Sequence, residues 1–166
     1  MTAQDLNHVT GEEFREGMAY LAGAVNIVTT DGPAGRAGFT ASAVCSVTDS
    51  PPTLLVCVNR SSSAAAPFLG NAALCVNTVG PRHEALARLF GGKTPMDDRF
   101  AEAEWDVLGT GAPVLAEAVV AFDCVATRRE EIGTHVVIFA EIVAVRRSPD
   151  AVASAYFARR FHELRA

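Results

Sequence analysis

The longest β pattern in the chain lies toward its C-terminus and constrains the fold more than any other feature. Two runs rich in Val, Ala, Phe and Ile, residues 118–127 and 135–146, flank the turn region Glu-Glu-Ile-Gly-Thr at 130–134. Such a pair predicts a β-hairpin. Both runs are apolar on both faces for most of their length, so we expect the hairpin to be covered on each side. A chain built around it should be mainly β.

Four shorter β patterns precede this hairpin, and together they predict a barrel. Residues 31–35, Asp-Gly-Pro-Ala-Gly, form a hairpin-type connection, so the segment after them should pair back on the strand before them. Six or so strands with few helices, at this spacing, indicate a closed or nearly closed β-barrel. The four shorter strands are predicted over residues 25–30, 38–48, 53–58 and 74–79.

Short helices should join these strands. Thr10 and Glu13 have the spacing of a capping box and predict a helix over 11–22. A Pro and a Gly-Gly pair bound a second predicted helix over 81–90. Less regular segments are expected as a serine-capped helix ending at Leu69, a surface connection over 93–100, and a short helix with a tail from Pro149.

Length and composition favour one compact domain over residues 1–166. Hydrophobic residues make up 49% of the chain and charged residues 20%, which excludes a disordered chain and leaves apolar surface for a second subunit. The formal charge of −5 gives no electrostatic reason to bind nucleic acid or an acidic membrane. No apolar run approaches the length of a membrane span, so we expect a cytoplasmic protein. The four widely spaced cysteines, Cys45, Cys57, Cys75 and Cys124, are expected to be buried in a reducing compartment.

The segment Gly38–Thr48, Gly-Phe-Thr-Ala-Ser-Ala-Val-Cys-Ser-Val-Thr, is unusual for a strand because most of its side chains are small. Ala and Ser in place of Leu and Ile forgo burial of about 1.5 to 3 kcal/mol per large side chain. Small side chains also let a ligand approach the backbone closely. We therefore expect this segment to bind a ligand.

Several common catalytic motifs are missing from the sequence. Gly32, Gly35 and Gly38 are spaced G-x-x-G-x-x-G and precede a β pattern, which excludes the dinucleotide fingerprint of a Rossmann fold. The chain has no P-loop and no nucleophile elbow. Its histidines and cysteines lack the paired spacing of metal ligands, so no metal is expected.

Three features are open to a functional and a structural interpretation. Arg60 with Ser61, Ser62 and Ser63 could cradle a phosphate, or form an ordinary serine-rich loop. His135, at a strand start, could touch a ligand or serve as a hydrogen-bonded structural residue. The arginine pair at 159–160, beside two aromatic residues, could hold a dinucleotide or lie on a solvated face.

Several motifs in a fixed order resemble one family over nearly the whole chain, from Phe14 to His162. This family is the flavin reductases of two-component monooxygenases, whose fold is the flavin-binding split β-barrel, a Greek-key antiparallel architecture. The matching motifs are Ala-Val-Asn-Ile-Val-Thr-Thr at 24–30, Gly-Phe-Thr-Ala-Ser-Ala at 38–43, Ser-Val-Thr at 46–48, Pro-Pro at 51–52, Cys-Val-Asn at 75–77 and Gly-Thr-His at 133–135.

The resemblance assigns roles to individual residues. It implies that the isoalloxazine ring and ribityl chain of a flavin lie against Phe39, Thr40, Ala41, Ser42, Ala43, Cys45 and Ser46. It implies a loop on the phosphate side of the flavin, formed by Arg60, Ser61, Ser62 and Ser63. Lys93 and Thr94 would close this site from another side. His135 would be the catalytic residue beside the nicotinamide, and the pyridine nucleotide would be held by His135, Tyr156, Phe157, Ala158 and Arg159.

The sequence departs from the family pattern in two places. Thr134 stands where many members have Asp, and the tail carries Arg159 and Arg160 in place of a commoner version that contains Gly. Two branches of the family are similar to different parts of the chain. Segments 30–38 and 89–96 look like the flavin reductase of pyrimidine utilisation, whereas 132–135 and 156–162 look more like the reductase of 4-hydroxyphenylacetate 3-monooxygenase.

The resemblance implies an NAD(P)H:FMN oxidoreductase that passes reduced flavin to a separate oxygenase. FMN is the expected flavin, with FAD as the alternative, and NADH the expected donor, with NADPH as the alternative. The active site would lie at a homodimer interface. The competing interpretations are a flavin- or haem-binding barrel that stores or senses its ligand without catalysis, and a purely structural dimer.

Overall fold

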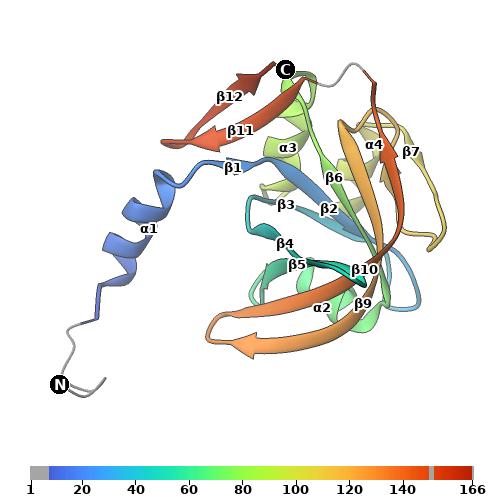
Figure 1. Cartoon of the computed structure of the whole chain (residues 1–166), viewed down its shortest axis with the longest axis horizontal. Helices are drawn as coiled ribbons and strands as arrows, with labels where there is room; N and C mark the ends of the chain where they lie inside the picture. The colour runs from blue at the N-terminus through green and yellow to red at the C-terminus, as the bar shows by residue number, and fades with distance from the viewer. Residues whose placement is uncertain (1–7, 150–151, 166) are drawn as a thin grey trace.

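The computed structural model describes residues 8–149 and 152–165, and it is mostly antiparallel β structure with short helices (Figure 1). Seven strands form the main sheet, in the order β3-β2-β6-β9-β10-β5-β4, and a separate sheet has the order β1-β11-β12. The main sheet consists of β2 (Asn26–Thr30), β3 (Ala37–Ala41), β4 (Val44–Asp49), β5 (Pro52–Asn59), β6 (Ala73–Thr78), β9 (Val120–Ile132) and β10 (His135–Arg147). The smaller sheets contain β1 (Gly23–Ala24), β11 (Ala153–Phe157) and β12 (Arg160–Leu164), and β7 (Trp105–Asp106) with β8 (Val114–Leu115).

The main sheet coils into a barrel that is not closed by hydrogen bonds. Its two edge strands, β3 and β4, follow each other in sequence and are joined only by Ser42 and Ala43. Strand β3 pairs with β2, whereas β4 pairs with β5 on the opposite edge. The expectation that 38–48 pairs back as one strand is therefore wrong beyond Ala41. The chain changes edge at two small residues, and the seam of the split barrel lies there.

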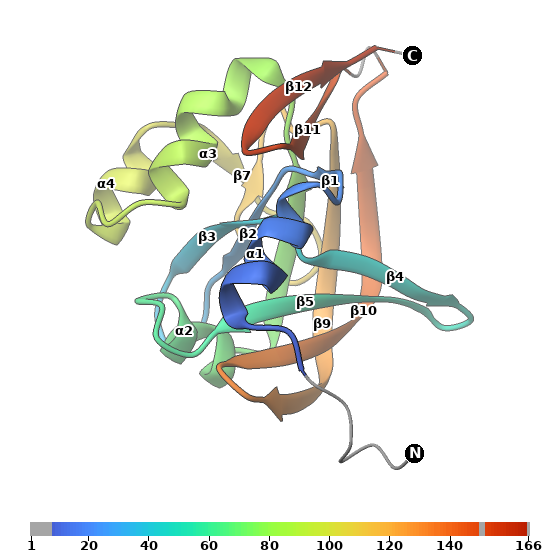
Figure 2. The same cartoon turned by 90° about the vertical axis from the view of Figure 1, so that its left-hand side faces the viewer.

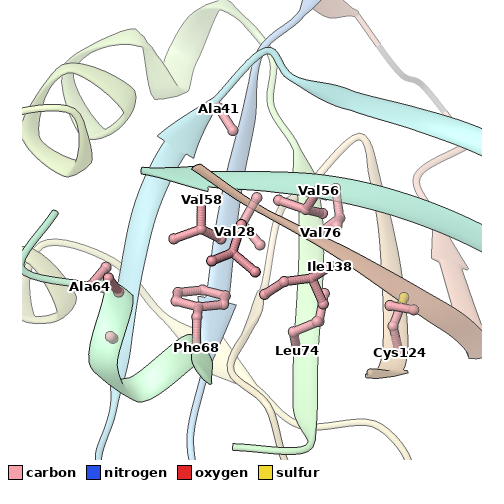
Figure 3. Packing of buried hydrophobic residues seen from close by; sticks show 14 of the residues in the cluster. Val28, Ala41, Val56, Val58, Ala64, Phe68, Leu74, Val76, Cys124 and Ile138 are labelled. Atoms are coloured by element: carbon pink, nitrogen blue, oxygen red, sulfur yellow. The ribbon is translucent and has the colours of Figure 1, made fainter. Parts of the chain in front are cut away.

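Two apolar cores lie on opposite faces of β2. Val28 packs inside the barrel and Ile27 packs outside it, as the two-residue period of a strand requires. Inside the barrel, Phe68 from α2 (Ala65–Gly70) lies among Val58, Val28 and Leu74 (Figure 3). The outer core is covered by the 3₁₀ turn Pro81–His83, α3 (Glu84–Phe90) and α4 (Met96–Ala101) (Figure 2).

The long hairpin of β9 and β10 has the predicted strands and turn, but it is not covered on both sides. Buried and more exposed residues alternate along β10 from His135 to Ala140, and Val143 and Val145 of its second half are exposed. Ile132 at the tip of β9 is also exposed. The expectation was wrong because only one of the two apolar faces of the hairpin is buried within a single chain.

The structure also corrects the helix assignments. The capping box of Thr10 and Glu13 is confirmed, but α1 (Gly11–Ala19) ends before residue 22 and contains no buried residue. The N-cap of α2 is Ala64, not a serine, since the three serines form the preceding turn. The predicted helix over 81–90 divides into the 3₁₀ turn and α3.

Two further segments differ from their predicted structure: residues 93–100, expected as a surface connection, and the C-terminal segment, expected as a helix with a tail. Residues 93–100 include most of α4, whose Phe100 is buried against Phe90 and Trp105 with ring centroids 5.2 and 4.9 Å away. The C-terminal segment is the hairpin β11–β12 instead of a helix and tail, although the first residues of that prediction, 150 and 151, lie outside the described part. Across the described residues, no helix is long and apolar enough to cross a membrane.

Candidate active site

A groove of about 420 Å³ lies where the barrel seam meets the C-terminal hairpin. Thr40, Ala41 and Ser42 form one wall, at the end of β3. Arg88 and Gly91 contribute from the end of α3. The hairpin β11–β12, which lies beside α3 in both views, contributes Tyr156 and Phe161 (Figures 1 and 2).

The β3 wall is held in place by hydrogen bonds that engage the side chain of Thr40 and the backbone of Ala41. The Thr40 hydroxyl donates to the Ala87 carbonyl of α3, and the Asn26 side-chain amide donates to the Ala41 carbonyl at 3.2 Å. Ser42 and Ala43 follow, exposed, where the chain leaves the β3 edge. A flat ring can approach this backbone closely because Ala and Ser project so little.

The C-terminal hairpin supplies aromatic faces on the other side of the groove. The rings of Tyr156 and Phe161 meet edge to face with centroids 5.3 Å apart. Phe157 points elsewhere and packs edge to face on Tyr20, at 5.8 Å. Ala158 and Arg159 form the turn, with φ of 48° and 60°. Of the four tail residues predicted to bind the nucleotide, the structure thus places Tyr156 in the groove.

A second group of predicted residues forms around the start of β10. His135 pairs with Asn59 of β5, and the backbone N–H of Arg60 donates to the Thr134 carbonyl at 3.0 Å. Asn59 in turn accepts from the N–H and hydroxyl of Ser61, at 2.9 and 2.8 Å. The structure therefore unites the predicted phosphate loop, residues 60–63, with His135, and neither lines the groove itself.

Phe39 connects this second group with the β3 wall. Its ring meets that of Phe68 edge to face, with centroids 5.0 Å apart, and Phe68 belongs to the helix that follows the serine loop. Cys45 and Ser46 lie on β4, on the opposite edge of the sheet from β3, and both are exposed. The predicted flavin wall is thus assembled from both edges of the barrel seam.

Arg99 supports the predicted site from behind, and the sequence interpretation missed it. It is 4% exposed, and its guanidinium donates to the carbonyls of Thr94 at 2.7 Å, Gly92 at 2.9 Å, Phe90 at 3.2 Å and Gly38 at 3.4 Å. One buried side chain thus fixes the loop that carries Lys93 and Thr94 against the start of the β3 wall. No sequence signal revealed it, because residues 93–100 show neither a helical nor a strand period.

Arg88 was also missed. Its guanidinium lies over the Phe161 ring, 4.7 Å from the centroid, and donates through Nη2 and Nε to Oε1 of Glu84, at 2.7 and 3.1 Å. The sequence predicts residues 81–90 only as a helix bounded by a Pro and a Gly-Gly pair. The four-residue spacing of Glu84 and Arg88 was visible as an ion pair, but not its place beside a groove.

The cysteines do not add a reactive thiol at the two buried positions. Burial raises the pKa of Cys124 to about 12 and raises that of Cys75 as well, so both thiols stay protonated at neutral pH. Cys57 is partly buried, with a pKa raised by the same cause, and Cys45 is exposed, which corrects the expectation that all four are buried.

The residues present fit a flavin and a pyridine nucleotide. The groove offers a wall of small residues for a flat ring and aromatic faces for a second one, and Arg88, Arg60 and the serine hydroxyls are groups that bind phosphate. In this arrangement Thr40 to Ser42 would hold the ring system, and the loop 60–63 would hold a phosphate.

Comparisons with known proteins identify the family of this chain. The family described as flavin reductase like domain matches residues 18–165. The FMN reductase (NADH) RutF of Pantoea ananatis is 58% identical over 156 residues, covering 94% of this chain and 82% of that protein. The FMN reductase (NADH) RutF of Serratia proteamaculans is 57% identical over 157 residues, covering 95% and 90%.

Two solved structures have the same fold at substantial identity. A candidate flavin reductase from Haemophilus somnus superposes with a TM-score of 0.91 at 44% identity, covering 94% of this chain and all of that one. The NADH:FAD oxidoreductase SgcE6 of Streptomyces globisporus, solved with NAD and FAD fragments, gives 0.83 at 27% identity, covering 95% and 96%. The family match spans more than half of the chain, and the chain therefore belongs to the family of flavin reductase like domains.

Proposed function

We propose that the protein is an NADH-dependent FMN reductase that supplies reduced flavin to a separate oxygenase. The observation that carries this proposal is the groove between Thr40–Ser42 and the C-terminal hairpin, which offers facing surfaces for two flat rings. The relatives named FMN reductase (NADH) RutF, at 57 and 58% identity, support FMN and NADH as the pair of substrates.

The bound flavin would accept a hydride from the nicotinamide, and the protein's part is to position both rings. The backbone of Thr40 to Ser42 would support the flavin ring, with Phe39, Ala43, Cys45 and Ser46 extending this wall across the seam. Arg60 and the serines at 61–63 would hold its phosphate, with Lys93 and Thr94 on the loop that Arg99 fixes. Tyr156 would cover the nicotinamide and exclude water from the groove.

His135 has a positioning role in this proposal. Its Nδ1 lies 2.8 Å from the Thr134 hydroxyl, and its strand begins beside the serine loop. Hydride transfer requires no general acid or base from the protein. His135 would therefore orient the bound nucleotide or flavin, and its loss should weaken the reaction without ending it.

Of the two candidate branches, we propose the pyrimidine-utilisation type. The RutF names support it, as does the similarity of segments 30–38 and 89–96 to that branch. The oxygenase that receives the reduced flavin would then act on pyrimidines.

The proposed compartment is the reducing cytoplasm, and the four free cysteines support this location.

We also propose that the protein is a homodimer. Helix α1 projects from the barrel and contains no buried residue, while Phe14 and Met18 on it are exposed (Figure 1). A nine-residue helix is too short to be stable in water by itself, so another surface must pack against it. A second copy of the chain would cover this stripe.

The proposed activity is tested by following NADH oxidation with added FMN, without oxygen, using the purified protein. Rapid oxidation matched by equal reduction of FMN supports a reductase. A protein that binds FMN without accelerating NADH oxidation would be a storage or sensing barrel. A protein whose melting temperature does not change with FMN would be a structural dimer.

A further inference from the structure

Arg88 occupies a distinctive place in the groove. Among the described residues that line it, Arg88 alone carries a full charge. Its side chain is 62% exposed, so it is free to meet a ligand. Its guanidinium stacks on the Phe161 ring of the C-terminal hairpin, with Cζ 4.7 Å from the ring centroid. The groove therefore joins an aromatic surface to one positively charged, forked donor.

We infer that Arg88 binds a phosphate group of the incoming pyridine nucleotide, and that Glu84 competes with this phosphate for the guanidinium. This inference rests on the proposed function. A guanidinium binds phosphate through two parallel N–H bonds, and such charge-assisted bonds are stronger than neutral ones. The diphosphate of NADH has this chemistry.

The position of Arg88 favours the nucleotide phosphate over the phosphate of FMN. Arg88 contacts the hairpin through Phe161, and Phe161 packs against Tyr156. The predicted FMN phosphate loop at 60–63 belongs to the other group of residues, beside His135. A nucleotide whose nicotinamide ring lies under Tyr156 would bring its diphosphate along the hairpin toward Arg88.

Glu84 provides a second test, because neutralising it should change NADH binding in the opposite direction to the loss of Arg88. Both of its hydrogen bonds from Arg88 use the single oxygen Oε1 and the donors Nη2 and Nε. The carboxylate therefore occupies the Nε–Nη2 edge, one of the edges through which a guanidinium can bind a phosphate, and it also repels an anion. Because exposed ion pairs contribute little to folding, Glu84 can be neutralised without unfolding the helix.

The experiment compares Arg88→Gln, Arg88→Lys and Glu84→Gln with the wild type, by steady-state kinetics with NADH and FMN varied in turn. Arg82→Gln is the matched control, since Arg82 is exposed to a similar degree as Arg88 and pairs with Glu117 at 3.0 Å beside another hollow. Arg88→Gln should raise the KM for NADH roughly tenfold, with kcat and the KM for FMN within about twofold of the wild type. Arg88→Lys should lie between.

Glu84→Gln should change the KM for NADH in the other direction and lower it about threefold, by relieving competition and repulsion. A merely structural role for the Arg88 pair predicts no such opposite change. Salt should raise the wild-type KM for NADH, and this dependence should be smaller in Arg88→Gln. Arg82→Gln should match the wild type in every measurement.

Three results would overturn the inference: an unchanged KM for NADH in Arg88→Gln, a change confined to the KM for FMN, or an unchanged or higher KM for NADH in Glu84→Gln. Failure of the proposed function would appear separately, as a wild type that does not reduce FMN. In that case, titration of NADH into the wild type and Arg88→Gln still decides the role of Arg88, and equal affinities would contradict it.

Discussion

Arg99 lies in α4, and its guanidinium is the shared donor for four backbone carbonyls in the loop after α3, at the end of α3 and in β3. Removing it would leave these buried acceptors without a partner, which costs about 1 to 3 kcal/mol for each group that water cannot reach. A lysine cannot replace it, because one ammonium cannot span four carbonyls in the plane that a guanidinium fits.

Arg99→Lys should therefore lower the free energy of unfolding by at least about 2 kcal/mol, measured by urea denaturation. Arg36→Lys is the matched control, since Arg36 is an exposed arginine that pairs with Asp97 at 3.2 Å and lies over Phe100. That change should cost less than about 1 kcal/mol. Equal decreases in the free energy of unfolding of the two variants would show that the four hydrogen bonds to carbonyls do not stabilise the fold more than an exposed ion pair does.

His135→Ala tests the second group of site residues. The variant should lower kcat/KM for NADH about tenfold, the equivalent of one hydrogen bond of roughly 1.4 kcal/mol, and should still reduce FMN. Stopped-flow flavin reduction measures this directly. Complete loss of reduction, with the circular dichroism spectrum unchanged, would show that His135 does more than position a ligand.

At the scale of elements, the sequence patterns located most strands but not the breaks between them. Short apolar runs located the central strands β5 and β6 to within one or two residues. The division of 38–48 into β3 and β4 escaped prediction because Ser42 and Ala43 continue the small-residue pattern. A change of sheet edge depends on the pairing of β3 with β2 and β4 with β5, which is a tertiary property.

The C-terminal hairpin was missed for a related reason. Its turn residues, Ala158 and Arg159, are not the Asn and Gly that signal a two-residue hairpin turn, although both have positive φ. Arg159→Gly should therefore raise the free energy of unfolding by about 0.5 to 1 kcal/mol. Glycine relieves the strain of a positive φ, and this gain exceeds the cost of the greater conformational entropy that glycine gives the unfolded chain.

Arg160→Gly is the control for this prediction. Arg160 lies in β12, opposite Phe157, where glycine should destabilise by about 0.5 to 1 kcal/mol. Urea titration of the two variants should move their midpoints in opposite directions. Destabilisation by both changes would contradict the assignment of residues 158–159 as a strained turn.

At the scale of the whole molecule, the composition indicated more apolar surface than one chain buries, and the structure shows where part of it lies. Phe14 and Met18 on α1 are 58% and 46% exposed, and Val143 and Val145 of β10 are exposed as well. No pattern within one sequence distinguishes a stripe that packs on its own barrel from one that packs on a second copy.

The homodimer proposal predicts that the wild type sediments with the mass of two chains and that Phe14→Asp shifts it toward one, because a buried carboxylate in the interface would be strongly unfavourable. Glu16→Ala, on the same exposed helix, should leave the dimer intact. Sedimentation equilibrium measures both. A stable wild-type monomer that binds and reduces FMN would contradict the proposal.

In the proposed function, the groove between Thr40–Ser42 and the C-terminal hairpin brings nicotinamide and flavin rings into contact for hydride transfer. The most direct test is anaerobic stopped-flow absorbance of FMN bleaching, with ordinary NADH and with NADH deuterated at the transferred position of C4. We predict bleaching far faster than in a protein-free mixture, slowed by deuterium, and slowed further at low NADH in Tyr156→Ala. Bleaching at the protein-free rate, or an identical rate in Tyr156→Ala at every NADH concentration, would contradict the claim.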